Sequence, residues 1–203
     1  MKIALIGATG NVGSKVLTEA LSRGHQVTGI ARHVEKLKGR SGVTARPVDL
    51  ADEEKLAEAL RGHDAVIVSV RYQNNDIRHA LAAAKAASVK RIVFVGGAAS
   101  LEASPGVRLL DTPGFPDVIK VEAAPAALAL ERIREEKSLD WTFVSPSIML
   151  VPGERTGKFR IGGDQVLKDE KGESRISQED LSVAILDELE KPRHIRKRFT
   201  VGY

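Results

Sequence analysis

Three glycines near the start of the chain have the spacing of a phosphate-binding turn. Gly7, Gly10 and Gly13 follow the short apolar run KIALI, and a helix-like segment begins directly after them. In such a turn one glycine permits a sharp change of direction, a second lets a phosphate approach the backbone, and a third lets the helix pack on the strand. Free N–H groups at the start of the helix then bind the anion. We therefore expect a pyrophosphate-binding loop made of Gly7, Thr9, Gly10, Asn11, Val12 and Gly13.

Two other structures could explain the same glycines. A P-loop also binds phosphate, but it requires lysine followed by serine or threonine, and here Ser14 precedes Lys15. A tight structural turn without a nucleotide is the second alternative. The motif lies between a predicted strand and a predicted helix, and another strand follows about 20 residues further on, which favours the dinucleotide loop.

Arg32, which directly follows the second apolar run QVTGIA, indicates which dinucleotide binds. An Asp or Glu at this position would bind the ribose 2′-OH of NAD, whereas the guanidinium fork of an arginine matches a 2′-phosphate. The sequence therefore favours NADP, with NAD as the alternative cofactor. A solvated surface arginine is the interpretation that needs no ligand.

Alternating segment types predict the fold that positions these residues. Val- and Ile-rich apolar runs of strand length occur at residues 2–6, 26–31, 64–70, 91–97 and 141–147. Amphipathic segments separate them, and the first places its apolar residues on one helical stripe: Val12, Val16, Leu17, Ala20 and Leu21. Strands that are apolar on both faces are typical of buried parallel sheets. We predict a doubly wound, mostly parallel α/β sheet with a Rossmann fold, as a single domain over residues 1–203.

The last fifty residues have a different pattern. Residues 154–177 are polar and glycine-containing, which predicts a loop with one or two hairpins. Ser177 is a suitable N-cap for a helix that ends before Pro192, and RFTVGY is a candidate final strand. We expect residues 150–203 to form a C-terminal extension that covers the carboxyl edge of the sheet on the substrate side.

Further site residues are expected where the strands end, because ligands of open α/β sheets bind outside the carboxyl ends of the strands. Asp49 could accept a hydrogen bond from the adenine amino group, or it could cap the following helix. Arg71 and Tyr72 are candidates for the substrate side. The predicted cofactor contacts at strand ends are Asp49, Leu50, Ser69, Val70, Arg71, Gly96, Gly97, Ser145, Pro146 and Ser147.

Composition excludes several classes of site. The 203 residues include no cysteine, so disulfides and thiolate chemistry are excluded, and a reducing, cytoplasmic location is expected. No apolar segment has the length of a membrane span, and the N-terminus does not resemble a signal peptide. The five histidines lack ligand spacing, so we expect no metal site.

The formal net charge of +4 is modest, and it suits an anionic small molecule better than nucleic acid. The basic segment 191–199 has no recognition-helix pattern, so we interpret it as a solvated edge. We expect a small-molecule acceptor as the partner, no nucleic acid and no membrane, with the chain as a monomer or homodimer.

Several segments together resemble one family over nearly the whole chain. GATGNVG, Arg32, Asp49, FVGGAASLE, DTPGFP, WTFVSPS and PGERTGKFRIGGDQVL are similar to the bacterial NADH-flavin reductases. These form an atypical branch of the short-chain dehydrogenase/reductase superfamily and are related to NmrA-like NAD(P)-binding proteins. The resemblance implies a single Rossmann domain, NAD(P)H binding, and reduction of a flavin or a related acceptor.

One departure from the superfamily narrows the expected chemistry. Most of its reductases use a Tyr-x-x-x-Lys pair, in which the tyrosine protonates a carbonyl oxygen. Here Pro116 stands four residues before Lys120, and neither Tyr72 nor Tyr203 has a lysine four residues later. Carbonyl reduction is therefore not expected. The resemblance implies that Lys120 lies near the nicotinamide ribose and positions the cofactor.

The remaining function hypotheses differ in whether turnover occurs. Hydride transfer to a flavin or quinone depends mainly on stacking and proximity, because solvent can supply the proton. The alternative is an NmrA-like sensor that binds NADP(H) without turnover. A third possibility, an epimerase or dehydratase that uses bound NAD, needs an acid–base pair that the sequence does not contain.

Overall fold

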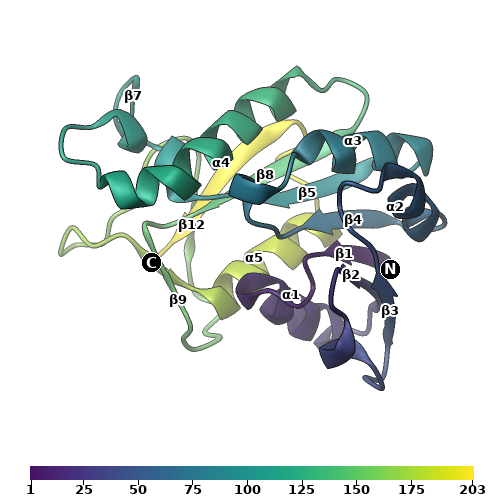
Figure 1. The fold of residues 1–203 in the computed structure, drawn as a ribbon. Helices are drawn as coiled ribbons and strands as arrows, with labels where there is room; N and C mark the ends of the chain where they lie inside the picture. Colours follow the sequence, from purple (N-terminus) through teal and green to yellow (C-terminus); the bar gives the residue numbers. More distant parts are fainter.

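The computed structural model describes residues 1–203, and its main sheet has eight strands in the order β10-β12-β8-β5-β4-β1-β2-β3 (Figure 1). Neighbouring strands are parallel except for β10 and β12, which are antiparallel. The order reverses between β1 and β4, so the predicted doubly wound sheet is confirmed. The strands are β1 Lys2–Ile6, β2 Gln26–Ala31, β3 Val43–Pro47, β4 Ala65–Val68, β5 Arg91–Val95, β8 Asp140–Pro146, β10 Arg160–Gly162 and β12 Lys197–Gly202.

Helices cover both faces of this sheet (Figure 1). One face carries α1 Asn11–Ser22 and α5 Gln178–Glu190, and the other carries α2 Glu53–Leu60, α3 Ile77–Ala86 and α4 Asp117–Glu135. None of the helices combines the length and apolar character that a membrane span needs. The short 3₁₀ turns are η1 Glu35–Leu37, η2 Tyr72–Asn74, η3 Ala98–Ser100 and η4 Leu109–Asp111. Two small sheets pair β6 Glu102–Ser104 with β7 Val107–Arg108, and β9 Met149–Val151 with β11 Arg175–Ser177.

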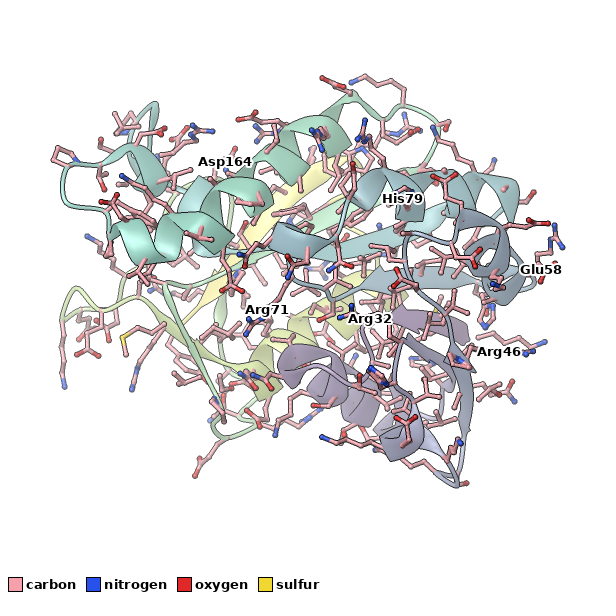
Figure 2. All side chains as sticks on the ribbon, in the orientation of Figure 1. Arg32, Arg46, Glu58, Arg71, His79 and Asp164 are labelled. Carbon is pink, nitrogen blue, oxygen red and sulfur yellow. The ribbon has the colours of Figure 1, made fainter.

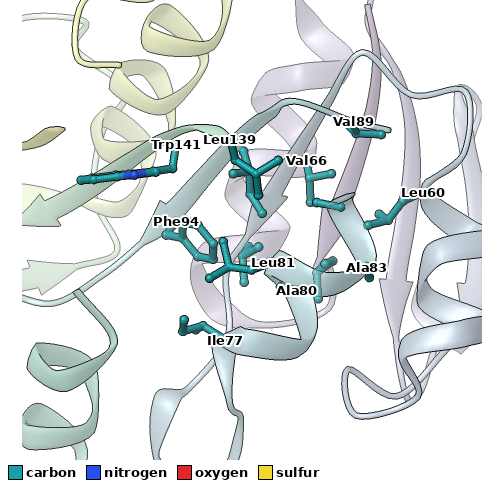
Figure 3. Close-up of a cluster of buried hydrophobic side chains, with 14 of the residues drawn as sticks. Leu60, Val66, Ile77, Ala80, Leu81, Ala83, Val89, Phe94, Leu139 and Trp141 are labelled. Atoms are coloured by element: carbon teal, nitrogen blue, oxygen red, sulfur yellow. The ribbon is translucent and has the colours of Figure 1, made fainter. Parts of the chain in front are cut away.

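Two hydrophobic cores, one on each face, hold these layers together. In β1, Ile3 and Leu5 face the α1–α5 core, while Ala4 and Ile6 face the core under α2, α3 and α4. Such burial of alternate residues on both faces explains why β1 reads as a continuous apolar run. Figure 3 shows part of the second core, in which Trp141 is buried.

The C-terminal fifty residues are part of the main architecture. Strands β12 and β10 extend the sheet beyond β8, and α5 packs beside α1, so this segment completes the fold. The predicted hairpins are wrong, because β10 pairs with β12 and β11 pairs in parallel with β9. These partners lie far away in the sequence, and local polarity carries no information about them. The Ser177 cap of α5 is confirmed, since its hydroxyl accepts from the Asp180 N–H at 2.9 Å.

A buried carboxylate fixes the segment between α4 and β8. Glu136 forms an ion pair with Lys85, and its Oε1 also accepts from the Ser138 hydroxyl at 2.6 Å and the Leu139 N–H at 3.2 Å. Burial opposes ionisation, but the hydrogen bonds from Lys85, Ser138 and Leu139 outweigh it and lower the pKa of Glu136 from 4.5 to about 2.

We expect Glu136 to stabilise the fold above about pH 4.5 and to lose this contribution as the pH falls towards 2. The sign follows because the unfolded chain binds a proton that the folded chain releases. In urea unfolding from neutral to acidic pH, the difference in free energy of unfolding between the wild type and Glu136→Gln should therefore shrink. Glu135→Gln, at the exposed neighbour, should show little dependence. A Glu136→Gln deficit that is constant over this range would contradict the assignment.

Candidate functional site

The glycine loop joins β1 to α1 at the carboxyl edge of the sheet, where the strand order reverses. Gly7 has a φ of +83°, and a Cβ there would lie 2.0 Å from the carbonyl oxygen of Ser69. A Cβ at Gly13 would lie 2.0 Å from the carbonyl oxygen of Gly7. The chain's own backbone therefore requires glycine at both positions, one for the turn and one for the close packing of α1.

Gly10 has a different environment from the other two glycines. Its φ is −73°, it is exposed, and a Cβ there would meet only the Gly7 carbonyl oxygen, at 3.3 Å. Packing within the chain therefore places only a mild demand for glycine at this position. The open space beside Gly10 is where the backbone of a dinucleotide loop approaches a phosphate.

The N-terminus of α1 is also uncapped. Side chains cap α2, α3 and α5, whereas Gly10 gives α1 no side-chain cap and its first turn has no acidic residue. The first helical hydrogen bond runs from the Ser14 N–H to the Gly10 carbonyl at 2.9 Å. The N–H groups of Asn11, Val12 and Gly13 have no acceptor in the chain and suit an anion.

Arg32 lies at the end of β2, beside this loop. The Gly7 N–H donates to the Ile30 carbonyl at 2.8 Å, and Arg32 follows two residues later. The side chain of Arg32 is exposed and makes no ion pair or hydrogen bond in the structure. Figure 2 shows Arg32 between the layer of α1 and the layer of α2, α3 and α4. Its guanidinium is thus free to meet a phosphate.

Asp49 and Leu50 follow β3. The carboxylate of Asp49 is exposed and accepts from the Ala51 N–H at 2.9 Å through Oδ1, which leaves its Oδ2 free. The cap of α2 is Asp52, so the alternative role of Asp49 as a helix cap is wrong. Leu50 is buried in the core, so it can offer a ligand only its backbone.

Ser69, Val70 and Arg71 follow β4, directly against the glycine loop. The Ser69 N–H donates to the Ile6 carbonyl at 2.9 Å, and the Ser69 carbonyl lies against Gly7. Arg71 is exposed, and its Nε lies 3.2 Å from Oε1 of Glu122 on α4. This contact places Glu122 beside Arg71 at the site.

Tyr72, in η2, packs against the end of β5. Its hydroxyl donates to the Val95 carbonyl at 2.7 Å, and its ring packs against Phe143. Burial of the phenol raises the pKa of Tyr72 above its ordinary value. Tyr72 therefore has a structural role and does not supply a proton.

Gly96 and Gly97 follow β5, and a side chain would meet different surroundings at the two positions. A Cβ at Gly96 would lie 2.0 Å from the Phe143 ring, so core packing excludes it. A Cβ at Gly97 would meet nothing within 4 Å. Gly97 therefore leaves open space at this edge of the sheet.

The end of β8 and the start of α4 contain the other predicted contacts. Ser145, Pro146 and Ser147 are all buried. The Ser147 hydroxyl donates to the Val201 carbonyl at 2.9 Å, while the Ser145 hydroxyl has no partner. Lys120 is exposed and forms an ion pair with Asp117 at 2.9 Å within the first turns of α4. Its position near a nicotinamide ribose stays a prediction.

The segment PGERTG, which carries much of the family resemblance, packs against the two helices beside the glycine loop. Arg155 donates to both carboxylate oxygens of Glu19 on α1, at 2.7 and 2.8 Å. Glu19 is 5% exposed, and the hydrogen bond from Arg155 lowers its pKa. On α5, the fully buried Asp180 accepts from the Gly157 N–H at 2.8 Å and from the Tyr203 hydroxyl at 2.9 Å. The motif therefore has a structural role.

The following segment GGDQ also has a structural role. Asp164 accepts from Nε of the buried Arg198 at 2.7 Å, and its carbonyl accepts from the Glu102 N–H at 2.8 Å. Sequence reasoning did not identify Glu19, Asp180 or Arg198 as partners of these motifs. Because they lie on remote elements, no local spacing indicates the pairing.

No group of three or more His, Asp or Glu side chains is arranged to hold a metal ion. A polar hollow of about 480 Å³ lies at the amino ends of β1, β2 and β3, away from the glycine loop. Its lining is mostly polar and includes Lys2, Thr28 and His63, but His63 is already bound to Thr28 Oγ1 at 2.7 Å and the Leu60 carbonyl at 3.0 Å. The chemistry described above therefore does not involve this hollow.

Comparisons with known proteins agree with this geometry. The model of an NAD(P)H-binding family matches residues 7–192. YwnB of Bacillus subtilis, an uncharacterised protein, is 37% identical over 99% of this chain and 98% of its own length. A structure of a candidate epimerase from Bacteroides thetaiotaomicron is 40% identical, with a TM-score of 0.93 over 100% of this chain and 96% of that one. A structure of a candidate NADH-flavin reductase from Streptococcus pneumoniae is 34% identical, with a TM-score of 0.88 over 100% of this chain and 99% of that one.

Proposed function

Because the chain belongs to the NAD(P)H-binding family, we propose that it is an NADPH-dependent reductase that transfers a hydride to a flavin or a similar planar acceptor. The observation that carries the cofactor half of this proposal is the open side of Gly10 beside the uncapped start of α1. A pyrophosphate there would accept hydrogen bonds from the N–H groups of Asn11, Val12 and Gly13.

Arg32 supports NADPH as the preferred form of the cofactor. Its guanidinium has no partner within the chain, and it follows β2, where a Rossmann fold contacts the adenosine ribose. A 2′-phosphate would accept two parallel hydrogen bonds from this fork. Asp49, with a free carboxylate oxygen at the end of β3, is available for the adenine amino group.

The class of acceptor that we propose depends on the absence of a tyrosine that could protonate a carbonyl oxygen. When bound, NADPH supplies a hydride from its nicotinamide ring. The chain offers no tyrosine to protonate a carbonyl oxygen, because the Tyr72 hydroxyl is bound to Val95 and the Tyr203 hydroxyl to Asp180. Solvent can supply the proton instead. Acceptors whose reduction depends on stacking and proximity, such as flavins and quinones, meet this condition.

The open space at Gly97 and the resemblance to candidate NADH-flavin reductases support a planar acceptor. A redox sensor that binds NADP(H) without turnover is the second candidate, and the lack of a tyrosine donor is compatible with it as well. An epimerase, as one structural relative is described, would need an acid–base pair that this edge does not contain.

We expect NADPH oxidation to be slow and to be supported by FMN, FAD, riboflavin or a quinone, with little or no activity toward simple aldehydes and ketones. Steady-state loss of the NADPH absorbance, with and without each acceptor, measures this. The protein-free rate with the same acceptor is the control. Tight NADPH binding without any acceleration above that control would favour the sensor, and rapid aldehyde reduction would contradict the proposed chemistry.

A further inference from the structure

We propose that Arg71 binds a phosphate group through its two Nη groups and that Glu122 is the positioning residue that orients it. This inference rests on the proposed function, since it assigns a further ligand contact in the same site. The two residues come from different elements, Arg71 from the end of β4 and Glu122 from α4.

The single ion pair of Arg71 leaves both Nη groups of its guanidinium free. Its only side-chain partner is Glu122, whose Oε1 lies 3.2 Å from Nε, and the side chain remains 76% exposed. Neither Nη group donates to any atom of the chain. The Asn75 amide donates to the Arg71 carbonyl at 2.7 Å, which fixes the backbone below the side chain.

Arg108 differs from Arg71 in this respect. It donates from Nε and Nη2 to Asp111 and from Nη1 to Glu131, so no edge of its guanidinium remains for a ligand. Glu122 engages Arg71 only at Nε. The opposite edge, with two parallel N–H groups, is the one that binds phosphate oxygens in a bidentate manner.

The location of Arg71 points to phosphate as the ligand. Ser69, two residues earlier, has its carbonyl against Gly7, so Arg71 leaves the sheet beside the glycine loop. Figure 2 shows both Arg71 and Arg32 between the two helical layers. A phosphate here has two sources: the pyrophosphate of the cofactor, or a phosphate on the acceptor, as in FMN.

The Arg71→Gln variant distinguishes these two sources of phosphate, because each source predicts a change in a different binding or kinetic constant. Loss of a hydrogen bond to a charged group costs roughly 1.5–3 kcal/mol, so the affected ligand should weaken about tenfold or more. If the source is the cofactor, the Kd values of NADPH and NADH both rise by this factor, because both contain the pyrophosphate. If the source is the acceptor, the KM of FMN rises while that of riboflavin, which lacks the phosphate, does not.

Glu122 is tested through its dependence on Arg71. Glu122→Ala should weaken the same ligand a few-fold with kcat unchanged, and it should have no further effect when combined with Arg71→Gln. Glu122→Asp keeps the negative charge that pairs with Arg71 and should restore most of the affinity. Glu131→Ala, at another exposed glutamate on α4 that pairs with an arginine, is the matched control and should change neither constant.

Unchanged Kd values for both dinucleotides in Arg71→Gln, together with an unchanged FMN-to-riboflavin KM ratio, would overturn the role of Arg71. A Glu122→Ala effect that persists in full without Arg71 would overturn the role of Glu122. The calorimetric Kd values need no turnover, so they test the cofactor contact even if the wild type reduces no acceptor. If the wild type binds neither dinucleotide, the proposed function itself fails.

Discussion

Gly10→Val should abolish NADPH binding and leave the protein folded. A Cβ at this position meets only one backbone oxygen of the chain, at 3.3 Å, whereas the added side chain fills the space where a pyrophosphate must approach α1. We expect the affinity to fall more than a hundredfold, which corresponds to about 3 kcal/mol. Isothermal titration calorimetry with NADPH measures the loss, and circular dichroism confirms the fold.

Two other glycines provide the matched comparison. Gly163 is exposed, and a Cβ there meets nothing within 4 Å, so Gly163→Val should bind NADPH like the wild type. Gly7→Val should instead destabilise the fold, because its Cβ would lie 2.0 Å from the Ser69 carbonyl oxygen at a positive φ. Undiminished NADPH affinity in Gly10→Val would place the nucleotide elsewhere.

Arg32→Gln should lower the affinity for NADPH and leave the affinity for NADH almost unchanged. Its guanidinium has no partner in the chain, so removing it disturbs no internal contact, and only the 2′-phosphate of NADPH loses a charged hydrogen bond. That loss is roughly 1.5–3 kcal/mol, so the NADPH affinity should fall about ten- to a hundredfold while the NADH affinity hardly changes. Calorimetric titration of each cofactor into each variant measures the difference.

Arg61, between α2 and the amino end of β4, is a suitable control for this experiment. It is also an exposed arginine without an ion pair, and it lies at the edge of the sheet opposite the glycine loop. Arg61→Gln should leave both affinities unchanged. Equal losses of NADPH and NADH affinity in Arg32→Gln would mean that Arg32 does not contact the 2′-phosphate.

The sequence predicted the sheet because the information needed is local. Apolar runs that are buried on both faces mark β1, β2, β4, β5 and β8, and glycines mark the turn from β1 into α1. The pairing of β10 with β12 and of β11 with β9 was not predictable in the same way. Such pairings depend on contacts between residues far apart in the chain, and they override local polarity.

The candidate site shows the same division. The glycine spacing predicted a loop whose backbone does require glycine at positions 7 and 13. The orientation of Tyr72 was not predictable, because it depends on a hydrogen bond to Val95 in another strand. The contact between Glu122 and Arg71 likewise depends on how α4 crosses the end of β4, which no spacing within either element encodes.

The central claim is that the chain transfers a hydride from NADPH to a planar acceptor. Mixing the protein with NADPH and FMN without oxygen tests it most directly, with the nicotinamide and flavin absorbances followed together. We predict that both absorbances fall in parallel, one NADPH consumed for each flavin reduced, faster than in the protein-free mixture. If NADPH binds but neither absorbance falls faster than in the protein-free mixture, the proposed reductase activity is contradicted. The chain would then be better explained as a sensor that binds NADP(H) without turnover.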